Sequence, residues 1–90
     1  MTISRTVKIC NRRGLHARAS AKFVTMASGL SAQIEVEKDG ARVVGTSIMG
    51  LMMLGAALGD DITIHGSGAD ADQAVAALAE LVEARFHEAE

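Results

Sequence analysis

Four segments of the chain are predicted to be β-strands. The third follows a hairpin signal, and the other three alternate apolar and polar side chains with a period of two, which is typical of half-buried strands. The segments are residues 3–10, 32–37, 41–44 and 62–65. Between the second and the third, Asp39-Gly40 favours positive φ at both positions and predicts a tight hairpin. Gly66-Ser67-Gly68 predicts the end of the last strand.

Two longer segments repeat apolar side chains at steps of three and four, which is typical of amphipathic helices. The first begins at Ala17 and is expected to stop at Gly29. Its apolar face consists of Ala19, Phe23, Met26, Ala27 and Leu30. The apolar face of the last consists of Ala71, Ala74, Val75, Leu78, Leu81, Val82 and Phe86. Asp70 is placed to cap this last helix, and Arg85 and His87 are expected near its negative end.

A shorter helix is predicted from Ser47 to about Leu54, although Gly50 lowers its helix propensity. The element order is therefore strand, helix, strand, strand, helix, strand, helix. This order is typical of a two-layer α+β domain in which helices cover one face of an antiparallel sheet. With 90 residues, of which 49% are apolar and only 2% aromatic, we expect one domain with an aliphatic core.

Composition and charge argue against several classes of function. A net charge of −2, the lack of a basic run and the scarcity of aromatic side chains do not suit nucleic-acid binding. No apolar run approaches the roughly 20 residues that span a bilayer, and residues 1–10 alternate, unlike a signal peptide. The lone Cys10 fits a reducing compartment and is expected to be a small buried or half-buried strand residue. We therefore expect a cytoplasmic protein without membrane insertion.

His16 is the one histidine placed where chemistry is expected. It falls at the N-cap of the first predicted helix or at the residue before it. The first turn of a helix offers free N–H groups and a partial positive charge to a phosphate, and a neutral imidazole there is a nucleophile. The helix dipole disfavours the imidazolium and so keeps the ring nucleophilic. A plain capping role is the alternative, because spacing alone does not separate the two.

The other two histidines carry no such indication. His65 is expected to be a solvent-facing strand residue, and His87 a partner of the last helix dipole. The three histidines are far apart in sequence, without Cys or paired carboxylates nearby, so neither a metal site nor a cofactor is expected. There is also no nucleophile–base pair of the kind that an independent enzyme needs.

Two short motifs resemble one known family. Residues 14–18, GLHAR, are similar to the active-site signature of HPr, the histidine-containing phosphocarrier of the bacterial phosphoenolpyruvate:sugar phosphotransferase system. Residues 47–52, SIMGLM, resemble the regulatory serine of that family and the short helix after it. The spacing of the motifs and the element order also match. The resemblance implies one HPr domain over residues 1–90, an open-faced sandwich with sheet order 1-4-2-3 and three helices on one face.

The resemblance also implies roles for residues of the first motif. His16 would carry the phosphoryl group on Nδ1, and the backbone amides of Ala17 and Arg18 and the Arg18 guanidinium would bind its oxygens. The protein would take the group from the phosphorylated first enzyme of the system and pass it to A-type acceptor components. It would be a monomeric carrier and co-substrate, not an enzyme with its own turnover.

Ser47 has a structural and a regulatory interpretation. At the start of the short helix, its plain role is that of an N-cap. The resemblance adds phosphorylation by an ATP-dependent kinase-phosphorylase, which would place about −1.5 to −2 charge on a docking surface. We therefore expect phosphorylation at Ser47 to slow the phosphorylation of His16.

The short helix also suggests where partners dock. At helical spacing, Ile48, Leu51 and Leu54 are expected in the core, which leaves Met49 and Met52 exposed. Methionine side chains are adaptable and suit a surface that several partners use. The alternative is a helix that is fully buried.

The first helix departs from the family pattern. Ala19 stands where the family usually has proline, which loosens the first turn and adds an N–H group. Thr25 and Ser28 stand where many relatives have lysine, so Lys22 is left as the docking cation. These departures leave two alternatives to a sugar-system carrier. One is a nitrogen-related or regulatory paralogue whose phosphorylation state signals to partners, and the other is a small binding module in which His16 is inert.

Overall fold

All seven predicted elements are present, in the predicted order, in a computed structural model that describes residues 2–89. The elements are β1 (Thr2–Lys8), α1 (Ala17–Ser28), β2 (Gln33–Lys38), β3 (Ala41–Val44), α2 (Ile48–Met53), β4 (Asp61–Ser67), α3 (Ala71–Glu83) and the 3-10 turn η1 (Arg85–His87). One predicted strand end is wrong, because β1 stops at Lys8 and not at Cys10. The fourth strand ends at Ser67, within the Gly66-Ser67-Gly68 segment that predicted its end. Gly66 does not end β4 because it still pairs with Ile3 on one side and Ile34 on the other.

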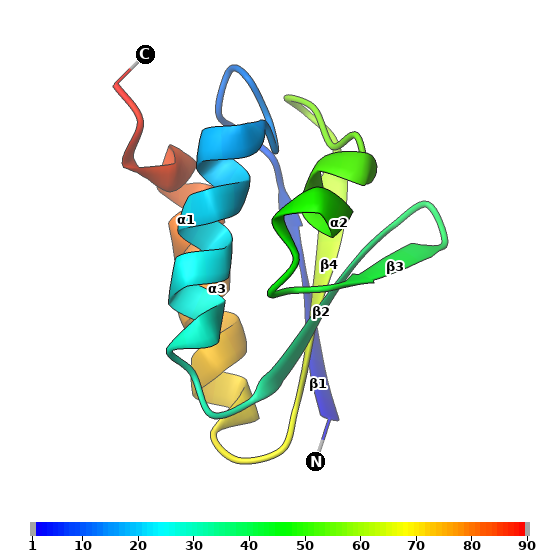
Figure 1. Ribbon diagram of the computed structural model, residues 1–90, viewed down its shortest axis with the longest axis vertical. Helices are drawn as coiled ribbons and strands as arrows, with labels where there is room; N and C mark the ends of the chain where they lie inside the picture. Colours follow the sequence, from blue (N-terminus) through cyan, green and yellow to red (C-terminus); the bar gives the residue numbers. More distant parts are fainter. Residues whose placement is uncertain (1, 90) are drawn as a thin grey trace.

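The four strands form one antiparallel sheet in the predicted order, β1-β4-β2-β3 (Figure 1). In the inner strand β4, His65 pairs with Ser4 of β1 and with Glu35 of β2. The predicted hairpin joins β2 to β3, and Asp39 and Gly40 have φ of 51° and 85°. Both values lie in the left-handed region that such a turn requires, which sets the register of β3 against β2.

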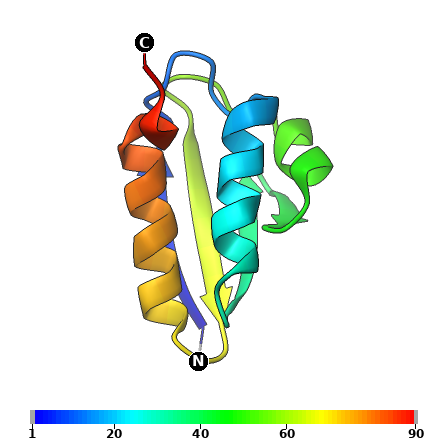
Figure 2. The same ribbon diagram turned by 60° about the vertical axis from the view of Figure 1, so that its left-hand side comes forward.

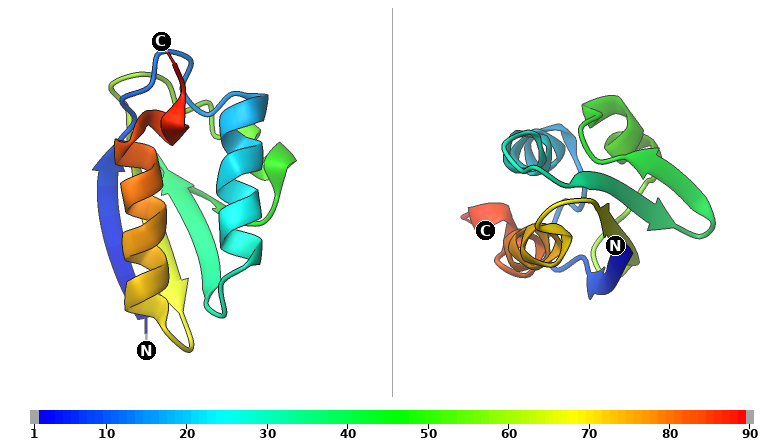
Figure 3. Two further views of the ribbon diagram at one scale, coloured as in Figure 1. Left: turned by 90° about the vertical axis from the view of Figure 1, so that its left-hand side faces the viewer. Right: turned by 90° about the horizontal axis from the view of Figure 1, so that it is seen from below.

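The three α-helices lie on one face of the sheet and leave the other face open (Figure 2, Figure 3). α3 contacts β1 and β4, α1 contacts α2 and α3, and α2 contacts β3. The core between the layers is aliphatic apart from two fully buried phenylalanines, Phe23 of α1 and Phe86 of η1. The predicted two-layer α+β architecture and its aliphatic core are therefore confirmed.

The predicted apolar stripes form the buried faces of the two long helices. In α1, Ala19, Phe23 and Ala27 are buried. Met26, and Leu30 just after the helix, pack against the core from its edge. In α3, the buried residues are Ala71, Ala74, Val75, Leu78, Ala79, Leu81 and Val82. Helical periodicity therefore located most of the core on this side of the sheet.

Both ends of α3 differ from the prediction. Asp70 occupies the N-cap position, but its φ of 57° is left-handed and its side chain makes no capping hydrogen bond. At the other end the helix stops at Glu83, and Arg85, Phe86 and His87 form one left-handed turn with φ of 59°, 54° and 57°. Arg85 and His87 therefore lie near the C-terminal end of α3, as predicted, but in the turn that follows the helix and not in its last turn. The turn keeps Phe86 in the core after the helix has ended.

The open face of the sheet carries polar side chains in cross-strand contact. His65 lies on this face, as predicted, but its side chain is only 16% exposed. Its Nδ1 lies 2.7 Å from the Ser4 hydroxyl oxygen, and its Nε2 lies 2.7 Å from a carboxylate oxygen of Glu37. His65 therefore links β1, β4 and β2, which gives this histidine a structural role.

Candidate functional site

His16 is the N-cap residue of α1, as predicted. Its backbone is extended, with φ of −73° and ψ of 178°, and its carbonyl accepts a hydrogen bond from the N–H of Ser20 at 2.9 Å. The ring nitrogen Nδ1 accepts a hydrogen bond from the N–H of Arg18 at 3.3 Å. Nδ1 therefore carries a lone pair and faces the free N–H groups of the first helical turn.

Gly14 lets the loop before α1 approach a second loop closely. Its φ is +63°, and a Cβ at this position would lie 2.3 Å from the carbonyl oxygen of Ala56. The N–H of the next residue, Leu15, donates to that same carbonyl at 3.0 Å, and the Leu15 side chain is buried. The glycine of the motif therefore sets the position from which the chain enters α1 at His16.

Glu88 is a residue of the site that the sequence did not indicate. Its carboxylate Oε2 lies 2.5 Å from Nε2 of His16, and its Oε1 accepts a hydrogen bond from the side-chain N–H of Asn11 at 3.1 Å. The side chains of His16 and Glu88 are 14% and 13% exposed. Because the two residues are 72 positions apart, no local spacing could have revealed the pair.

The Glu88 carboxylate is held in its charged form. Burial by itself raises the Glu88 pKa, but hydrogen bonds from His16 and Asn11 and the nearby positive charges of His16 and Lys22 outweigh burial and lower the pKa overall. A carboxylate beside Nε2 favours a proton on that nitrogen and leaves Nδ1 as the nucleophile.

The ring of His16 lies in a pocket of about 340 Å³ that is rich in cationic side chains. The lining residues are Arg12, Arg13, His16, Arg18, Lys22, His87, Glu88 and Ala89. Within residues 2–89, no hydrogen bond or ion pair engages the guanidinium of Arg18. The ammonium of Lys22, by contrast, donates to the carbonyl oxygen of Phe86 at 2.7 Å. Arg18 is therefore available to an incoming anion, whereas Lys22 anchors η1.

Ser47 is the N-cap residue of α2, as predicted. Its φ is −112°, and its hydroxyl oxygen accepts a hydrogen bond from the N–H of Gly50 at 2.9 Å. A Cβ on Gly50 would lie 3.1 Å from that oxygen and 3.2 Å from Cβ of Val43. The glycine that lowers the helix propensity therefore lets α2 pack closely against the end of β3.

An apolar patch surrounds α2. Its members are exposed, and they are Val44, Ile48, Met49, Met52, Met53 and Leu58. Exposure of Met49 and Met52 was predicted and is confirmed, at 70% and 42%. Ile48 was expected in the core, but it is 42% exposed, so that prediction is wrong. α2 has only six residues and buries Leu51 and Leu54 on its inner side, which leaves its first residue at the edge of the layer.

The apolar patch and the His16 pocket lie on neighbouring parts of the same surface. α2 lies beside the N-terminal half of α1, while η1 lies on the other side of α1 (Figure 1, Figure 2). Both α2 and η1 contact α1. His16, at the N-terminus of α1, is therefore flanked by the patch on one side and by the segment with Glu88 on the other.

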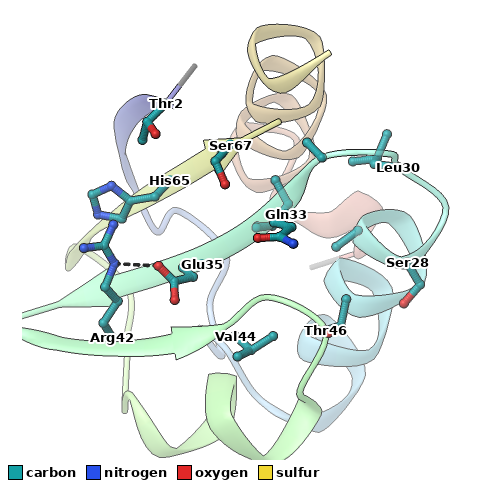
Figure 4. Close-up of a pocket in the computed structure, with 14 residues that line it drawn as sticks. Thr2, Ser28, Leu30, Gln33, Glu35, Arg42, Val44, Thr46, His65 and Ser67 are labelled. Carbon is teal, nitrogen blue, oxygen red and sulfur yellow. Dashed lines mark ion pairs between the residues drawn. The ribbon is translucent and has the colours of Figure 1, made fainter. Parts of the chain in front are cut away.

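A second and larger groove, of about 610 Å³, lies between the sheet and the C-terminal end of α1 (Figure 4). Gln33, His65 and Ser28 are among the residues around it. Glu35 and Arg42 form an ion pair of 3.0 Å on its wall. This groove contains none of the residues that the two motifs selected, so the candidate site is the smaller pocket at His16.

Cys10 is half-buried, as expected, but it lies two residues after the end of β1 and is not a strand residue. Its thiol donates to the carbonyl oxygens of Val82 and Glu83, at 3.4 and 3.5 Å. Across the described part of the chain, residues 2–89, no three His, Cys, Asp or Glu side chains form a group that could hold a metal ion. None of the helices in that same part is long and apolar enough to cross a membrane.

The fold and the site together define a class of protein, a small open-faced sandwich in which a histidine caps a helix beside cationic side chains. Comparisons with known proteins agree with this class. Residues 3–84 match the family described as "PTS HPr component phosphorylation site". Phosphocarrier protein HPr of Neisseria meningitidis is 46% identical over 88 residues, which cover 98% of this chain and 99% of that protein.

Two further comparisons extend this result. Phosphocarrier protein NPr of Shewanella violacea is 42% identical over 87 residues, which cover 97% of this chain and 96% of that protein. A crystal structure of HPr from Thermoanaerobacter tengcongensis has a TM-score of 0.92 at 43% identity, covering 98% of this chain and 99% of that one. The chain therefore belongs to the HPr family of phosphocarrier proteins of the phosphotransferase system.

Proposed function

We propose that this protein accepts a phosphoryl group on Nδ1 of His16 and passes it to a partner protein. The observation that carries the proposal is the position of Nδ1, which faces the N–H of Arg18 in the first turn of α1. A phosphoryl group on Nδ1 would bring its oxygens to the amides of Ala17 and Arg18, where a helix terminus favours anions. The Arg18 guanidinium would supply the compensating charge.

The transfer step depends on alignment and charge compensation. The lone pair of Nδ1 forms a bond to phosphorus, while the bond from phosphorus to the leaving atom of the donor breaks and its electron pair stays with the donor. The Nε2 proton remains on the ring, so in the product the imidazole ring is cationic and carries the anionic phosphoryl group on Nδ1. Transfer to an acceptor reverses these changes and restores the neutral ring. The protein is thus a co-substrate of two partners and has no turnover of its own.

Labelled phosphoenolpyruvate and a purified first enzyme of the phosphotransferase system test this proposal. We expect an acid-labile label on the wild-type chain, mapped to His16 by mass spectrometry under neutral or alkaline conditions. Absence of label would contradict the phosphocarrier function. A label confined to another residue would contradict the assignment of His16.

We propose the first enzyme and A-type acceptor components of the sugar branch as partners, in the cytoplasm. A nitrogen-related or regulatory role is the second candidate, because one relative of similar identity is named phosphocarrier protein NPr. Thr25 and Ser28 also leave α1 poor in cations, in keeping with this alternative. Transfer of label to a sugar-specific and to a nitrogen-related acceptor, compared at equal concentrations, separates the two candidates.

We propose that partners dock on the apolar patch around α2, chiefly on Met49 and Met52. Both side chains are exposed, and α2 packs against the helix that begins at His16. Flexible methionine side chains adapt to partners of different shape. Lys22 is a weaker docking candidate, because its ammonium is already bound to the Phe86 carbonyl.

We also propose that Ser47 is a regulatory phosphorylation site, with a serine kinase as the further partner. Its side chain is half-buried and lies directly before the exposed residues of α2. A phosphate there would place its charge at the edge of the apolar patch that partners are proposed to cover. The charge would have to be desolvated on docking, which weakens the complex.

Ser47→Asp is expected to lower the rate of His16 phosphorylation about tenfold. This corresponds to a loss of roughly 1.4 kcal/mol in the free energy of docking. The rate is measured with the phosphorylated first enzyme at a concentration below saturation. Ser47→Asn is the matched control, because asparagine keeps a capping acceptor without the charge. Equal rates for all three proteins would refute regulation by charge, and equal slowing by Asn would assign the effect to the helix cap.

A further inference from the structure

We infer that Glu88 is a positioning residue for phosphoryl transfer, whose carboxylate stabilises the cationic ring that forms when Nδ1 of His16 takes up the phosphoryl group. The inference rests on the proposed function and goes beyond it. It assigns a role in phosphoryl transfer to the segment that follows α3, and this segment lies outside both sequence motifs.

The contact between Glu88 and His16 has the geometry of a strong, charge-assisted hydrogen bond. Oε2 of Glu88 lies 2.5 Å from Nε2 of His16, and both side chains are largely excluded from water. On the other side of the ring, Nδ1 faces the N–H of Arg18. The carboxylate therefore leaves the phosphoryl position open and acts on the ring through the opposite nitrogen.

The left-handed turn η1 places Glu88 against Nε2 of His16. Phe86, in the middle of the turn, is fully buried, and its carbonyl oxygen accepts a hydrogen bond from Lys22 of α1 at 2.7 Å. Three consecutive residues other than glycine have positive φ here, a conformation that is unfavourable for each of them. Strain of this kind persists where the surroundings impose it, often at functional sites.

Asn11 couples Glu88 to the loop that carries His16. Its side chain is fully buried, and its amide nitrogen donates to the carbonyl oxygen of Gly14 at 2.9 Å and to Oε1 of Glu88 at 3.1 Å. Both partners are acceptors, which determines the orientation of the amide. Within residues 2–89 its Oδ1 is buried without a hydrogen-bond partner, an unfavourable state. The side-chain nitrogen of Asn11 therefore binds both the loop before α1 and the Glu88 carboxylate.

The charge of the His16 ring changes during transfer, and this changes the strength of its interaction with Glu88. In the proposed step the ring attacks as the neutral form with its proton on Nε2. Once Nδ1 is bonded to phosphorus, the same ring with the same proton is a cation. A carboxylate beside Nε2 interacts more strongly with the cation than with the neutral ring. Glu88 therefore shifts the equilibrium toward the phosphorylated form, in addition to any effect on the rate.

Exchange of label with the phosphorylated first enzyme, followed in both directions, tests this inference. Glu88→Gln is expected to lower the equilibrium constant for phosphorylation of His16 about tenfold, with slower acceptance and faster return. Glu80→Gln is the control, because it removes the same charge from an exposed position on α3 and should leave both rates unchanged. A purely structural role for Glu88 would slow both directions and keep their ratio, and that result would overturn the inference.

A pH titration of phosphorylated His16 by ¹⁵N NMR gives a second readout. The other titratable or charged side chains around the ring are Arg12, Arg13, Arg18, Lys22 and His87, which are the same in every variant. In Glu88→Gln, the ring is expected to lose its Nε2 proton at a pH about one unit lower than in the wild-type protein. An unchanged midpoint would count against the inference.

Glu88→Ala is measured alongside, because an introduced Gln amide could place an N–H group against the Asn11 donor. Both Glu88 variants should give the same direction of change. If the wild-type chain takes up no label, both the proposed function and this inference are contradicted. A wild-type chain labelled at His16, with an unchanged equilibrium constant in both Glu88 variants, would remove only the role of Glu88.

Discussion

Replacing His16 by asparagine is expected to abolish phosphoryl transfer while the protein stays folded. The imidazole is the nucleophile in the proposed reaction, and removing a nucleophile lowers a rate by at least about four orders of magnitude. Asparagine is one of the best N-cap residues, so α1 keeps an acceptor for its first-turn N–H groups. The measurement is the labelling rate with phosphoenolpyruvate and the first enzyme, together with the thermal midpoint.

Two further variants distinguish a loss of phosphoryl transfer from a loss of folding stability. His16→Ala also loses the nucleophile but removes the capping acceptor, so we expect its stability to fall by about 1 kcal/mol. Glu80→Gln changes an exposed residue of α3 that does not line this pocket and should keep near wild-type labelling. Acid-labile label on His16→Asn would show that a residue other than His16 carries the phosphoryl group.

Replacing Gly14 by alanine is expected to cause the largest loss of stability among the predicted single changes, roughly 3 kcal/mol. About 1–2 kcal/mol comes from holding a side chain at φ +63°, and the rest from the clash of Cβ with the Ala56 carbonyl 2.3 Å away. In a domain of this size the thermal midpoint falls by roughly 15 °C. Labelling of His16 should slow as well, because the clash displaces the loop that ends at His16.

Gly40→Ala provides the control for backbone strain alone. Gly40 also has a positive φ, of +85°, but no atom lies within 4 Å of a Cβ built there. Its substitution should therefore lose only about 1–2 kcal/mol and leave labelling unchanged. Similar losses of stability for the two variants would show that the close approach of Gly14 to Ala56 does not contribute.

The local features of the site could be predicted because they depend on residues that are close in sequence. His16 caps α1 through a contact with Arg18, two positions away, and Ser47 caps α2 through Gly50, three positions away. Such contacts follow from helix geometry as soon as the helix start is known. The resemblance to HPr, based on residues 14–18 and 47–52, then indicated which of these caps carries chemistry.

The wrong predictions fall where tertiary contacts outweigh local preference. Ile48 lies at the correct helical spacing for burial, yet the short α2 rests on Leu51 and Leu54 and leaves Ile48 exposed. Phe86 continues the apolar stripe of α3, but it reaches the core through a turn of opposite hand. Periodicity assumes that a helix continues, and it cannot indicate where packing ends the helix.

By itself the sequence determined the element order, the aliphatic core, the hairpin at Asp39-Gly40 and the place of His16 at the start of a helix. Each of these depends on period, turn chemistry or capping within a few residues. Only the tertiary structure determined that a carboxylate lies against Nε2, the nitrogen of the His16 ring opposite Nδ1. Glu88 is 72 residues from His16 and reaches it through a left-handed turn and the buried amide of Asn11. No local pattern encodes that contact, because it exists only when the segment after α3 packs against the loop before α1.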